Sequence, residues 1–321
     1  MSSISIGVDI GGTALKAGLV KSDGTILSTS EAPTGVGRPP EAIIADMAEL
    51  CRTVARQGGV SMDEIPAIGF GLPGLSDNVK GYIVHLTNVK WRWVPFRELF
   101  QKQLNKPIYM ENDATVAGLA EATCGVSKGA SSSFFITLGT GFGGGIVIGD
   151  RVHSGAHGVG SELGHMMVEC GPTARACNCG NSGCIERYVS SLALIEQAAA
   201  RMPSFPDSAL VKASGGNAEK LSPKIIFDAA KAGDALAKEL FDEFIRYLAL
   251  GIVSFINIFD PAMFVLGGGI SRAGNFLLNA VRAKVKEHIF YKDMPYGDIE
   301  LARLGNEAGI IGAAMVSANA L

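Results

Sequence analysis

The sequence carries little charge, and charge of one sign nowhere accumulates. Charged residues make up 18% of the chain, the formal net charge is −3, and no block of lysine and arginine occurs. Because binding to nucleic acid needs clustered basic residues that neutralise phosphates, we expect no nucleic acid among the partners of this chain.

Long apolar runs and a targeting segment are also missing. No apolar run reaches the roughly 20 residues that a helix needs to cross a bilayer, and the N-terminus lacks the charged and apolar regions of a signal peptide. Six cysteines in 321 residues, three of them close together, do not form a disulfide framework. We therefore expect a soluble, cytoplasmic protein without a membrane partner.

Glycine is the residue in clear excess. It occupies 41 of the 321 positions, whereas glycine averages about 7% in proteins. The glycines gather in short runs between apolar segments, which indicates backbone loops that approach a ligand closely.

The densest group of metal-binding side chains lies in 162–186, ELGHMMVECGPTARACNCGNSGCIE. One imidazole and three thiolates form the closed tetrahedral set of structural zinc sites, and this donor set favours zinc over iron. The alternative is three ordinary buried cysteines and a surface histidine. Cys170, seven residues before Cys177, is either a packed thiol or a spare ligand. We predict a structural zinc ion held by His165, Cys177, Cys179 and Cys184.

Two carboxylates, Glu162 and Glu186, flank the predicted zinc ligands. All four positions of the ion would be filled by protein, so no open position is left for a reacting water. We therefore interpret the ion as a clamp on its loop, which would hold Glu162, His165 and Glu186 toward a ligand.

The hydrophobic pattern predicts an α/β chain of alternating strands and helices. The segment 134–148 repeats the strand, glycine turn and strand of 4–19, about half a chain length later. Two copies of one unit predict a two-lobed protein with a cleft. Further strands are expected at 25–31, 66–72, 106–110, 262–270 and 298–304, and helices at 39–57, 95–104, 114–124, 192–202, 224–233, 235–259, 275–289 and 307–318.

The first glycine turn, DIGGTALK at 9–16, has the composition of an anion-binding loop. Successive N–H groups at Gly11 and Gly12 would form a concavity for phosphate, with the Thr13 hydroxyl and the Lys16 charge beside it. Asp9 suits a hydrated Mg²⁺ that bridges phosphates. A plain hairpin turn is the alternative for this segment taken alone.

The second glycine loop, LGTGFGGG at 138–145, contains a G-x-G-x-x-G match at Gly139, Gly141 and Gly144. A dinucleotide-binding loop needs a helix directly after it, whereas a strand is expected here. A second phosphate hairpin, including Thr140, fits better. A third glycine run follows a buried strand and would place an adenosine against backbone at Gly267, Gly268 and Gly269.

Asn112 and Asp113 follow a predicted strand and open a predicted helix. Such a pair is most often a helix cap. The functional alternative is that Asp113 takes a proton from an alcohol that attacks a γ-phosphoryl group, while Asn112 hydrogen-bonds a neighbouring hydroxyl. The two roles conflict, because a carboxylate that caps a helix has a lowered pKa and is a poorer base.

Eight segments spread over the chain resemble the ROK family of sugar kinases, and most closely the bacterial glucokinases of that family. The cysteine run with its upstream Glu-x-x-His is the most specific of them. The segments are DIGGTALK at 9–16, GLPG at 71–74, WRWVPF at 91–96, ENDA at 111–114, LGTGFGGG at 138–145, SELGH at 161–165, CNCGNSGCIE at 177–186 and LGGGIS at 266–271.

The resemblance implies an actin-like ATPase fold with duplicated ribonuclease-H-like halves and a cleft between two lobes. It implies a small lobe of 1–118 plus 303–321, and a larger lobe of 119–302 with the zinc site and a homodimer surface. ATP with Mg²⁺ would be the donor, and Asp113 the base. Repressors of the family carry an N-terminal winged-helix domain, which we expect this chain to lack. Sugar ligands would be Gly74, Asn112, Asp113, Glu162, His165 and Glu186.

The reaction predicted from these features is transfer of the γ-phosphoryl group of ATP to the 6-hydroxyl of glucose. A kinase for N-acetylmannosamine, fructose or allose is one alternative, and a sugar-responsive regulator without catalysis is another. Polyphosphate in place of ATP also stays open as the donor.

Overall fold

The structure, a computed structural model, describes residues 3–320. The chain divides into two compact units, each with its own internal contacts. The first unit comprises 1–135, 145–161 and 303–321, and the second comprises 136–144 and 162–302. The lobe boundaries expected from the sequence remain a prediction, and each unit is described by itself.

The first unit is built on a five-stranded sheet in the order β3-β2-β1-β4-β8. The opening segment forms the antiparallel strands β1 (Ile4–Ile10), β2 (Ala14–Lys21) and β3 (Ile26–Pro33), as its alternating pattern predicts. Exposure alternates along β3, which lies at the sheet edge. Strand β4 (Ile68–Leu72) lies between β1 and β8 (Ile108–Asn112), is buried throughout and runs parallel to both.

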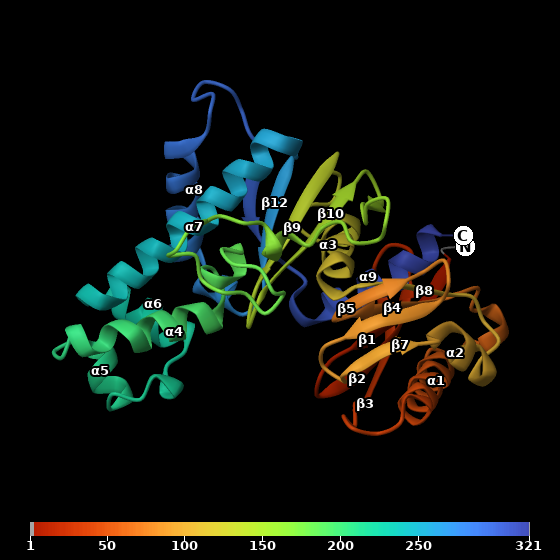
Figure 1. The fold of residues 1–321 in the computed structure, drawn as a ribbon. Coiled ribbons are helices and arrows are strands. Elements are labelled where there is room, and N and C mark those ends of the chain that lie inside the picture. Colours follow the sequence, from red (N-terminus) through yellow and green to blue (C-terminus); the bar gives the residue numbers. More distant parts are fainter. Residues whose placement is uncertain (1–2, 321) are drawn as a thin grey trace. The chain divides into compact units, whose positions relative to one another are not determined.

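Helices cover both faces of this sheet (Figure 1). α1 (Pro40–Gln57) and α2 (Phe96–Gln103) lie on one face, and α9 (Ala308–Asn319) lies on the other, against α3 (Asp113–Cys124). α9 can approach the sheet closely because glycines face it. A Cβ added at Gly69 would lie 1.7 Å from the Ala313 carbonyl oxygen, so only glycine fits there.

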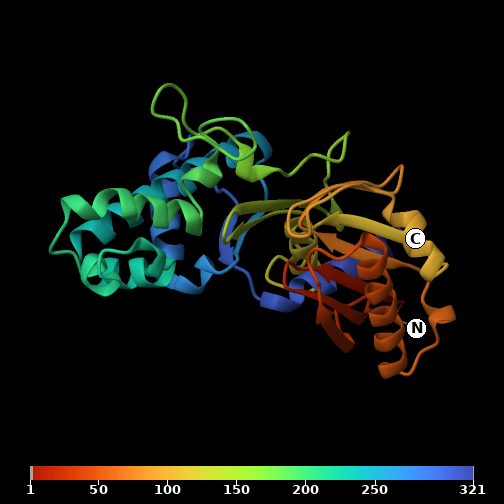
Figure 2. The ribbon, with the colours of Figure 1, turned by 60° about the horizontal axis from the view of Figure 1, so that its bottom comes forward.

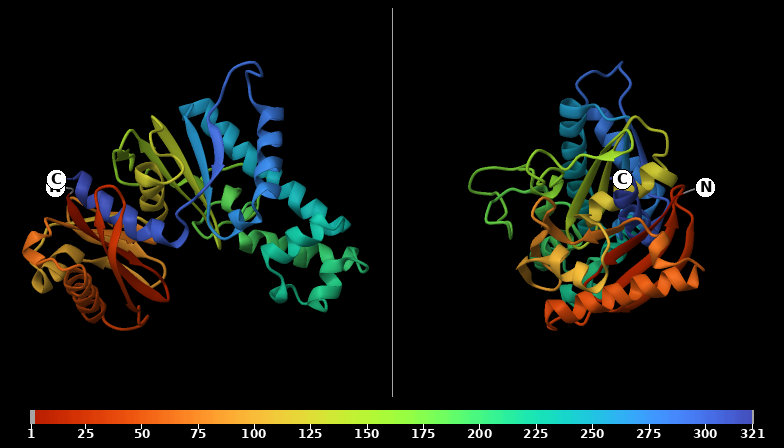
Figure 3. Two further views of the ribbon diagram at one scale, coloured as in Figure 1. Left: turned by 180° about the vertical axis from the view of Figure 1, so that it is seen from behind. Right: turned by 90° about the vertical axis from the view of Figure 1, so that its right-hand side faces the viewer.

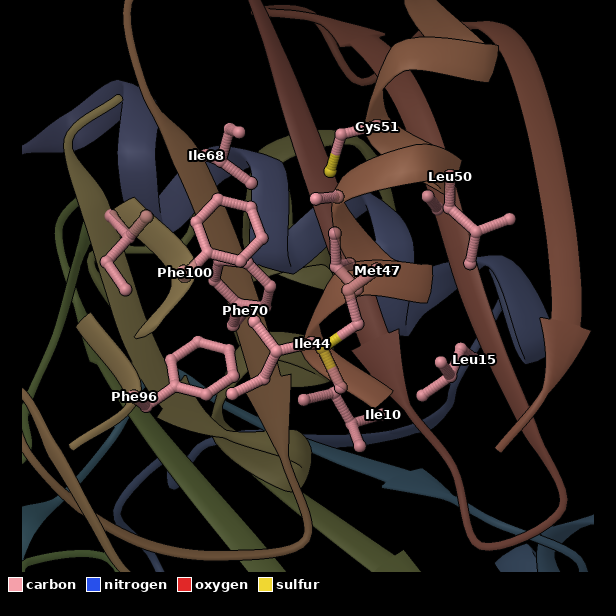
Figure 4. Close-up of a cluster of buried hydrophobic side chains, with 14 of the residues drawn as sticks. Ile10, Leu15, Ile44, Met47, Leu50, Cys51, Ile68, Phe70, Phe96 and Phe100 are labelled. Carbon is pink, nitrogen blue, oxygen red and sulfur yellow. The ribbon is translucent and has the colours of Figure 1, made fainter. Parts of the chain in front are cut away.

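The main core of the first unit lies between α1, α2 and the sheet. Figure 4 shows Ile44 and Met47 of α1 beside Phe70, Phe96 and Phe100. The ring of Phe70 meets those of Phe96 and Phe100 edge-on at centroid distances of 4.9 and 5.0 Å. The amphipathic spacing that predicts α1 therefore positions one wall of this core.

A small antiparallel sheet follows β4 and was not expected from the sequence. It consists of β5 (Gly74–Asp77), β6 (Tyr82–Leu86) and β7 (Trp91–Val94). Its strands are four or five residues long and β7 includes Trp93 at φ +52°, so the alternation that would reveal it is interrupted.

The second five-stranded sheet has the order β11-β10-β9-β12-β13 and repeats the arrangement of the first. The predicted internal repeat is therefore confirmed. The unit boundaries run through β9 and β10. The strands are β9 (Ser132–Leu138), β10 (Phe142–Ile148), β11 (Arg151–Val152), β12 (Met263–Gly267) and β13 (Asp298–Leu301).

The second unit is rich in helices, which Figures 2 and 3 show in green to blue. The longest, α7 (Ala235–Phe259), packs against α4, α6 and α8 and ends where Asp260 adopts a left-handed conformation before Pro261. A helix at Ala209–Ser214, α5, was not expected from the sequence. The remaining helices are α4 (Ser191–Arg201), α6 (Pro223–Lys231) and α8 (Asn275–His288).

Short 3₁₀ turns connect these elements. Two of them, Leu163–His165 and Ile185–Arg187, carry predicted site residues. Across residues 3–320, none of the helices combines the length and the apolar character needed to span a membrane. The other turns are Met62–Glu64, Met202–Ser204, Ala218–Lys220, Ile270–Ala273 and Gly305–Glu307.

Candidate active site and metal centre

The four predicted metal ligands come together in the second unit. The donor atoms of His165, Cys177, Cys179 and Cys184 all lie within 4.8 Å of one another. The sulfurs of Cys179 and Cys184 are 3.7 Å apart, and Nδ1 of His165 lies 3.8 Å from the sulfur of Cys177. A tetrahedral zinc ion with bonds of about 2.3 Å to sulfur separates two sulfur ligands by about 3.8 Å. The four donors therefore have the spacing of ligands around one tetrahedral metal ion.

Burial and local hydrogen bonds shift the pKa values of two cluster thiols in opposite directions. Burial, with the neighbouring Cys179 and Cys177 thiols, raises the pKa of Cys184 to about 12. A backbone hydrogen bond from Asn181 lowers the pKa of the exposed Cys179. Three thiolates crowd together favourably only around a positive charge, which deprotonates coordinating thiols.

Local turns bring the cysteines to one point. The N–H of Cys177 donates to the Asn181 carbonyl at 2.7 Å, and the N–H of Gly180 donates back to the Cys177 carbonyl at 3.0 Å. Gly180 and Gly183 have φ of +97° and +82°, a region that favours glycine. At Gly183 a Cβ would also lie 1.8 Å from the Glu169 carbonyl oxygen. The positive φ and this close approach therefore each exclude a residue other than glycine at this position.

Glu186, which follows the cluster, contacts the second glycine loop. Its Oε2 accepts a hydrogen bond from the N–H of Phe142 at 3.0 Å. A Cβ on Gly141 would lie 2.4 Å from the same oxygen, so the carboxylate occupies the space that glycine leaves. Glu162 is exposed at the start of the 3₁₀ turn, and its carbonyl accepts from the N–H of His165 at 3.1 Å. The structure thus brings Gly141, Glu186 and the metal-binding loop together.

In the first unit, Asn112 takes the capping role that the sequence left open. Its Oδ1 accepts from the N–H groups of Ala114 at 2.9 Å and Thr115 at 3.3 Å, and its Nδ2 points to the Gly74 carbonyl at 3.4 Å. Asp113 is the exposed first residue of α3, where one carboxylate oxygen accepts from the N–H of Ala114 at 2.8 Å. Both side chains therefore bond to the start of α3, with Asn112 as its cap.

Glu111, to which the sequence analysis gave no role, anchors this strand end. Oε1 accepts from the N–H of Asn112 at 2.9 Å, and Oε2 accepts from the Ser154 hydroxyl at 2.5 Å. Burial raises the pKa of Glu111, against the lowering effect of these two hydrogen bonds. The partner Ser154 lies 43 residues away, so no local pattern could have indicated the contact.

The first glycine turn is a tight hairpin between β1 and β2. The N–H of Gly11 donates to the Ala14 carbonyl at 3.0 Å, and the Thr34 hydroxyl donates to the Gly11 carbonyl at 2.7 Å. Gly12 and Thr13 are exposed. Lys16 lies opposite Asp9 across the two strands, and burial raises the pKa of Asp9 while Lys16 opposes the shift.

Asp9 and Asn112 lie at one edge of the first sheet. Asp9 of β1 pairs with Gly71 of β4. Leu72, the residue after Gly71, pairs with Asn112 of β8. The carboxyl ends of parallel strands are where open α/β sheets bind ligands. Gly309 of α9 also belongs to this edge, because a Cβ there would lie 2.9 Å from the Asp9 carboxylate. Gly309 was not expected at this site from the sequence.

The second and third glycine loops lie side by side in the second unit. The N–H of Gly139 donates to the Gly141 carbonyl at 3.0 Å, and strand β10 follows, so the loop is not a dinucleotide fingerprint. Gly268, at φ +82°, lies against Leu138 next to this loop. Thr140 is exposed, and Gly267 is buried at the end of β12.

A cavity of about 530 Å³ opens beside the third loop. Ser191, whose N–H donates to the Gly139 carbonyl at 2.8 Å, forms part of its wall, so the cavity adjoins both loops. Its remaining lining comes from α6 and from the 3₁₀ turn after Gly268, and includes Lys224, Phe227, Lys231, Gly269 and Arg272.

Comparison with known proteins gives the class of protein. The model of the ROK family matches residues 5–319, and the chain belongs to this family. Its solved relatives have the actin-like ATPase fold, and the duplicated sheets described above confirm that the chain shares it.

Particular relatives are sugar kinases. The chain is 36% identical over 314 residues to a glucokinase of Streptomyces coelicolor, covering 97% of this chain and 96% of that protein. It is 33% identical, with a TM-score of 0.79, to a ROK family glucokinase from Streptomyces griseus solved with glucose and AMPPNP, over 98% of this chain and 99% of that one. A ROK hexokinase from Thermus thermophilus has 32% identity and a TM-score of 0.84, over 99% and 98% of the two chains.

Proposed function

We propose that this chain is an ATP-dependent hexose kinase that transfers the γ-phosphoryl group of ATP to the 6-hydroxyl of glucose. The observation that carries the proposal is the exposed Asp113 carboxylate, at the same sheet edge as Asp9 and the first glycine hairpin. A relative of known structure binds glucose and an ATP analogue, which supports this pair of substrates.

Asp113 is the proposed general base. It accepts the proton of the 6-hydroxyl as that oxygen forms its bond to the γ-phosphorus, the phosphoanhydride bond breaks, and ADP leaves with the electron pair. Such a transfer depends mainly on positioning and charge stabilisation. Mg²⁺, held through water by Asp9, would neutralise charge on the phosphate oxygens.

Gly74, Asn112, Glu162, His165 and Glu186 are the proposed sugar-binding residues besides Asp113. The capping bonds occupy Oδ1 of Asn112, so its Nδ2 is the group available to a sugar hydroxyl. Nδ1 of His165 faces the Cys177 sulfur, so its Nε2 is the ring nitrogen that can donate to the sugar. Zinc, when bound, would fix the tautomer and orientation of this ring.

The phosphates would contact Gly11, Gly12, Thr13 and Lys16 in the first unit, and Gly139, Thr140 and Gly141 in the second. The adenosine would lie against Gly267, Gly268 and Gly269. The neighbouring cavity of about 530 Å³ falls in the usual range of about 300–1,000 Å³ for small-molecule sites. ATP is therefore favoured over polyphosphate, which has no group to fill that cavity.

The four closely placed donors support a structural rather than a catalytic zinc ion. Because protein groups fill all four positions, the ion would add rigidity to the loop that carries Glu162, His165 and Glu186, and no reacting water.

The assembly proposed for the chain is a homodimer through the larger lobe, 119–302, with 1–118 and 303–321 as the small lobe. In its support, large apolar side chains are exposed at the end of α7 and in the loop after α8: Ile258, Phe259, Phe290, Tyr291 and Met294. Exposed apolar groups of this size often mark interfaces. The six free cysteines support a cytoplasmic location, since thiols stay reduced there.

A panel of sugars, assayed with ATP by coupled detection of ADP, tests the function. We expect kcat/KM for glucose to exceed that for N-acetylmannosamine, fructose and allose. A higher value for one of those sugars would reassign the substrate. Sugar binding without any ADP would instead favour a regulator.

A further inference from the structure

A largely buried ion-pair cluster lies beside the metal-binding loop, and the roles proposed above leave it unexplained. Glu243 of α7 accepts from two arginines, through Oε1 from Arg175 at 2.5 Å and through Oε2 from Arg201. Only 19% of the Glu243 side chain and 21% of the Arg175 side chain are exposed. Burying charges is costly, and a buried ion pair is weak evidence for stability, so its position calls for a different reason.

Arg175 belongs to the loop that carries the metal ligands and lies between His165 and Cys177. The backbone N–H of Arg175 donates to the Tyr188 hydroxyl at 3.0 Å, and Nη1 of its guanidinium donates to the Arg187 carbonyl at 3.1 Å. Its guanidinium also lies 4.3 Å from the centre of the Tyr188 ring. A planar guanidinium can donate in two directions and stack at the same time, which the single ammonium of lysine cannot do.

The same residue is linked to site residues on both sides. Its carbonyl accepts from the N–H of Gly183 at 2.8 Å, directly before the metal ligand Cys184. Its guanidinium holds the carbonyl of Arg187, directly after Glu186. A shift of Arg175 would therefore move the metal-binding loop and the Glu186 carboxylate together.

α7 supplies the fixed end of this contact. Tyr247, one turn after Glu243, packs on Tyr188 with ring centres 4.2 Å apart, and its hydroxyl donates to Glu169 at 3.0 Å. Gly251, one further turn along, leaves room for Ile185, because a Cβ there would lie 2.5 Å from its side chain. One face of a long helix thus presents Glu243, Tyr247 and Gly251 to the loop.

We propose that Glu243 and Arg175 are positioning residues: through Arg175, the Glu243 carboxylate on α7 holds the metal-binding loop and Glu186 in the geometry that retains the metal and binds the sugar. The part that concerns the sugar rests on the kinase function proposed above. The part that concerns the metal does not.

The test compares three variants of the full chain, Glu243→Gln, Arg175→Lys and Arg201→Gln. The last is the matched control, because Arg201 shares the Glu243 carboxylate but otherwise donates to Gln197 of its own helix α4. The zinc content of each purified variant is measured, before and after incubation of the protein with zinc. The rate at which zinc passes from the protein to a chromogenic chelator is then followed. Circular dichroism checks that each variant is folded, and glucose and ATP kinetics follow.

Loss of a group that orients metal ligands typically costs about 10–100-fold in affinity or activity. We expect Glu243→Gln and Arg175→Lys to release zinc at least about tenfold faster and to raise KM for glucose by a similar factor, with less effect on KM for ATP. Arg201→Gln should stay near the wild type in both. The double variant Arg175→Lys with Glu243→Gln should be no worse than the single ones, because both break one contact.

Zinc release at the wild-type rate from folded Glu243→Gln, or equal effects in all three variants, would overturn the proposal. A wild-type protein that takes up no zinc would also overturn it. If the wild type holds zinc and the two variants release it, but no sugar is phosphorylated, then the positioning of the metal loop stands and the kinase proposal fails.

Discussion

Replacing Gly141 by alanine perturbs the contact between the second glycine loop and Glu186 with a single methyl group. The added Cβ would lie 2.4 Å from Oε2 of Glu186, whereas a carbon and an oxygen normally approach to about 3.4 Å. The carboxylate must therefore retreat by roughly 1 Å, which breaks its 3.0 Å hydrogen bond from the N–H of Phe142.

The size of the effect follows from that bond. A hydrogen bond to a charged group contributes about 1.5–3 kcal/mol, which corresponds to about 10–100-fold in an equilibrium constant. If Glu186 binds the sugar from its present position, KM for glucose should rise by about tenfold or more. The melting temperature should fall by several degrees, since about 1 kcal/mol shifts it by about 2–4 °C in domains of this size.

Steady-state kinetics with glucose and ATP varied separately, together with thermal unfolding, measure both effects. Gly139→Ala is the matched control, because a Cβ at Gly139 meets nothing within 4 Å. It should leave the melting temperature and KM for glucose near the wild type, although KM for ATP is free to change. If Gly141→Ala behaves like Gly139→Ala in both measurements, the reasoning about Glu186 is wrong.

Three further predictions concern Asp113, the metal ligands and Glu111. Asp113→Asn should lower kcat by about 100–10,000-fold, the range for a lost general base, while the affinity for glucose measured by calorimetry should stay within about threefold of the wild type. A near-normal kcat would show that Asp113 is not the general base. Cys177→Ser should lower the zinc content measured by elemental analysis and lower the melting temperature, whereas Cys51→Ser, at a cysteine outside the cluster, should keep the zinc. The raised pKa of Glu111 means that the folded state holds this proton more tightly, so its contribution to stability is greatest below the ordinary carboxyl pKa and declines as pH rises through the folded value. Urea unfolding should therefore show the wild type losing stability relative to Glu111→Gln as the pH rises above 4.5, and a constant difference would contradict the shift.

Local sequence was sufficient where the chemistry is local. His165, Cys177, Cys179 and Cys184 lie within 20 positions of one another, and their donor atoms converge as predicted. The duplicated sheets were also predictable, because the strand and glycine-turn pattern of 4–19 recurs at 134–148. The metal ligands are close enough in the chain for their spacing to reveal the cluster, and each copy of the sheet pattern is local although the two copies lie far apart.

Long-range contacts were not predictable in the same way. Glu111 bonds to Ser154, Glu186 bonds to Phe142, and Glu243 bonds to Arg175 across 43, 44 and 68 positions. Which residues meet at such separations depends on tertiary packing, and a single sequence holds no periodic trace of it. The sheet of β5, β6 and β7 was not predicted for another reason. Its strands are four or five residues long and include Trp93 in a left-handed conformation, so their sequence shows little alternation of apolar and polar residues.

The cap at α3 shows how one motif can carry two roles. Sequence alone left Asn112 and Asp113 as either a cap or a catalytic pair, because both residue types serve at helix starts. In the structure Asn112 is the cap, and the exposed Asp113 carboxylate also accepts from the N–H of Ala114. Only coordinates could show this, since it depends on which side chains turn back to the backbone.

Identification of the product formed from glucose and ATP, by phosphorus and carbon nuclear magnetic resonance, tests the central claim most directly. We expect ADP and glucose phosphorylated at the 6-hydroxyl in equal amounts, at a rate that Asp113→Asn nearly abolishes. Phosphate attached to another hydroxyl, or glucose left unchanged while the protein binds it, would contradict the account.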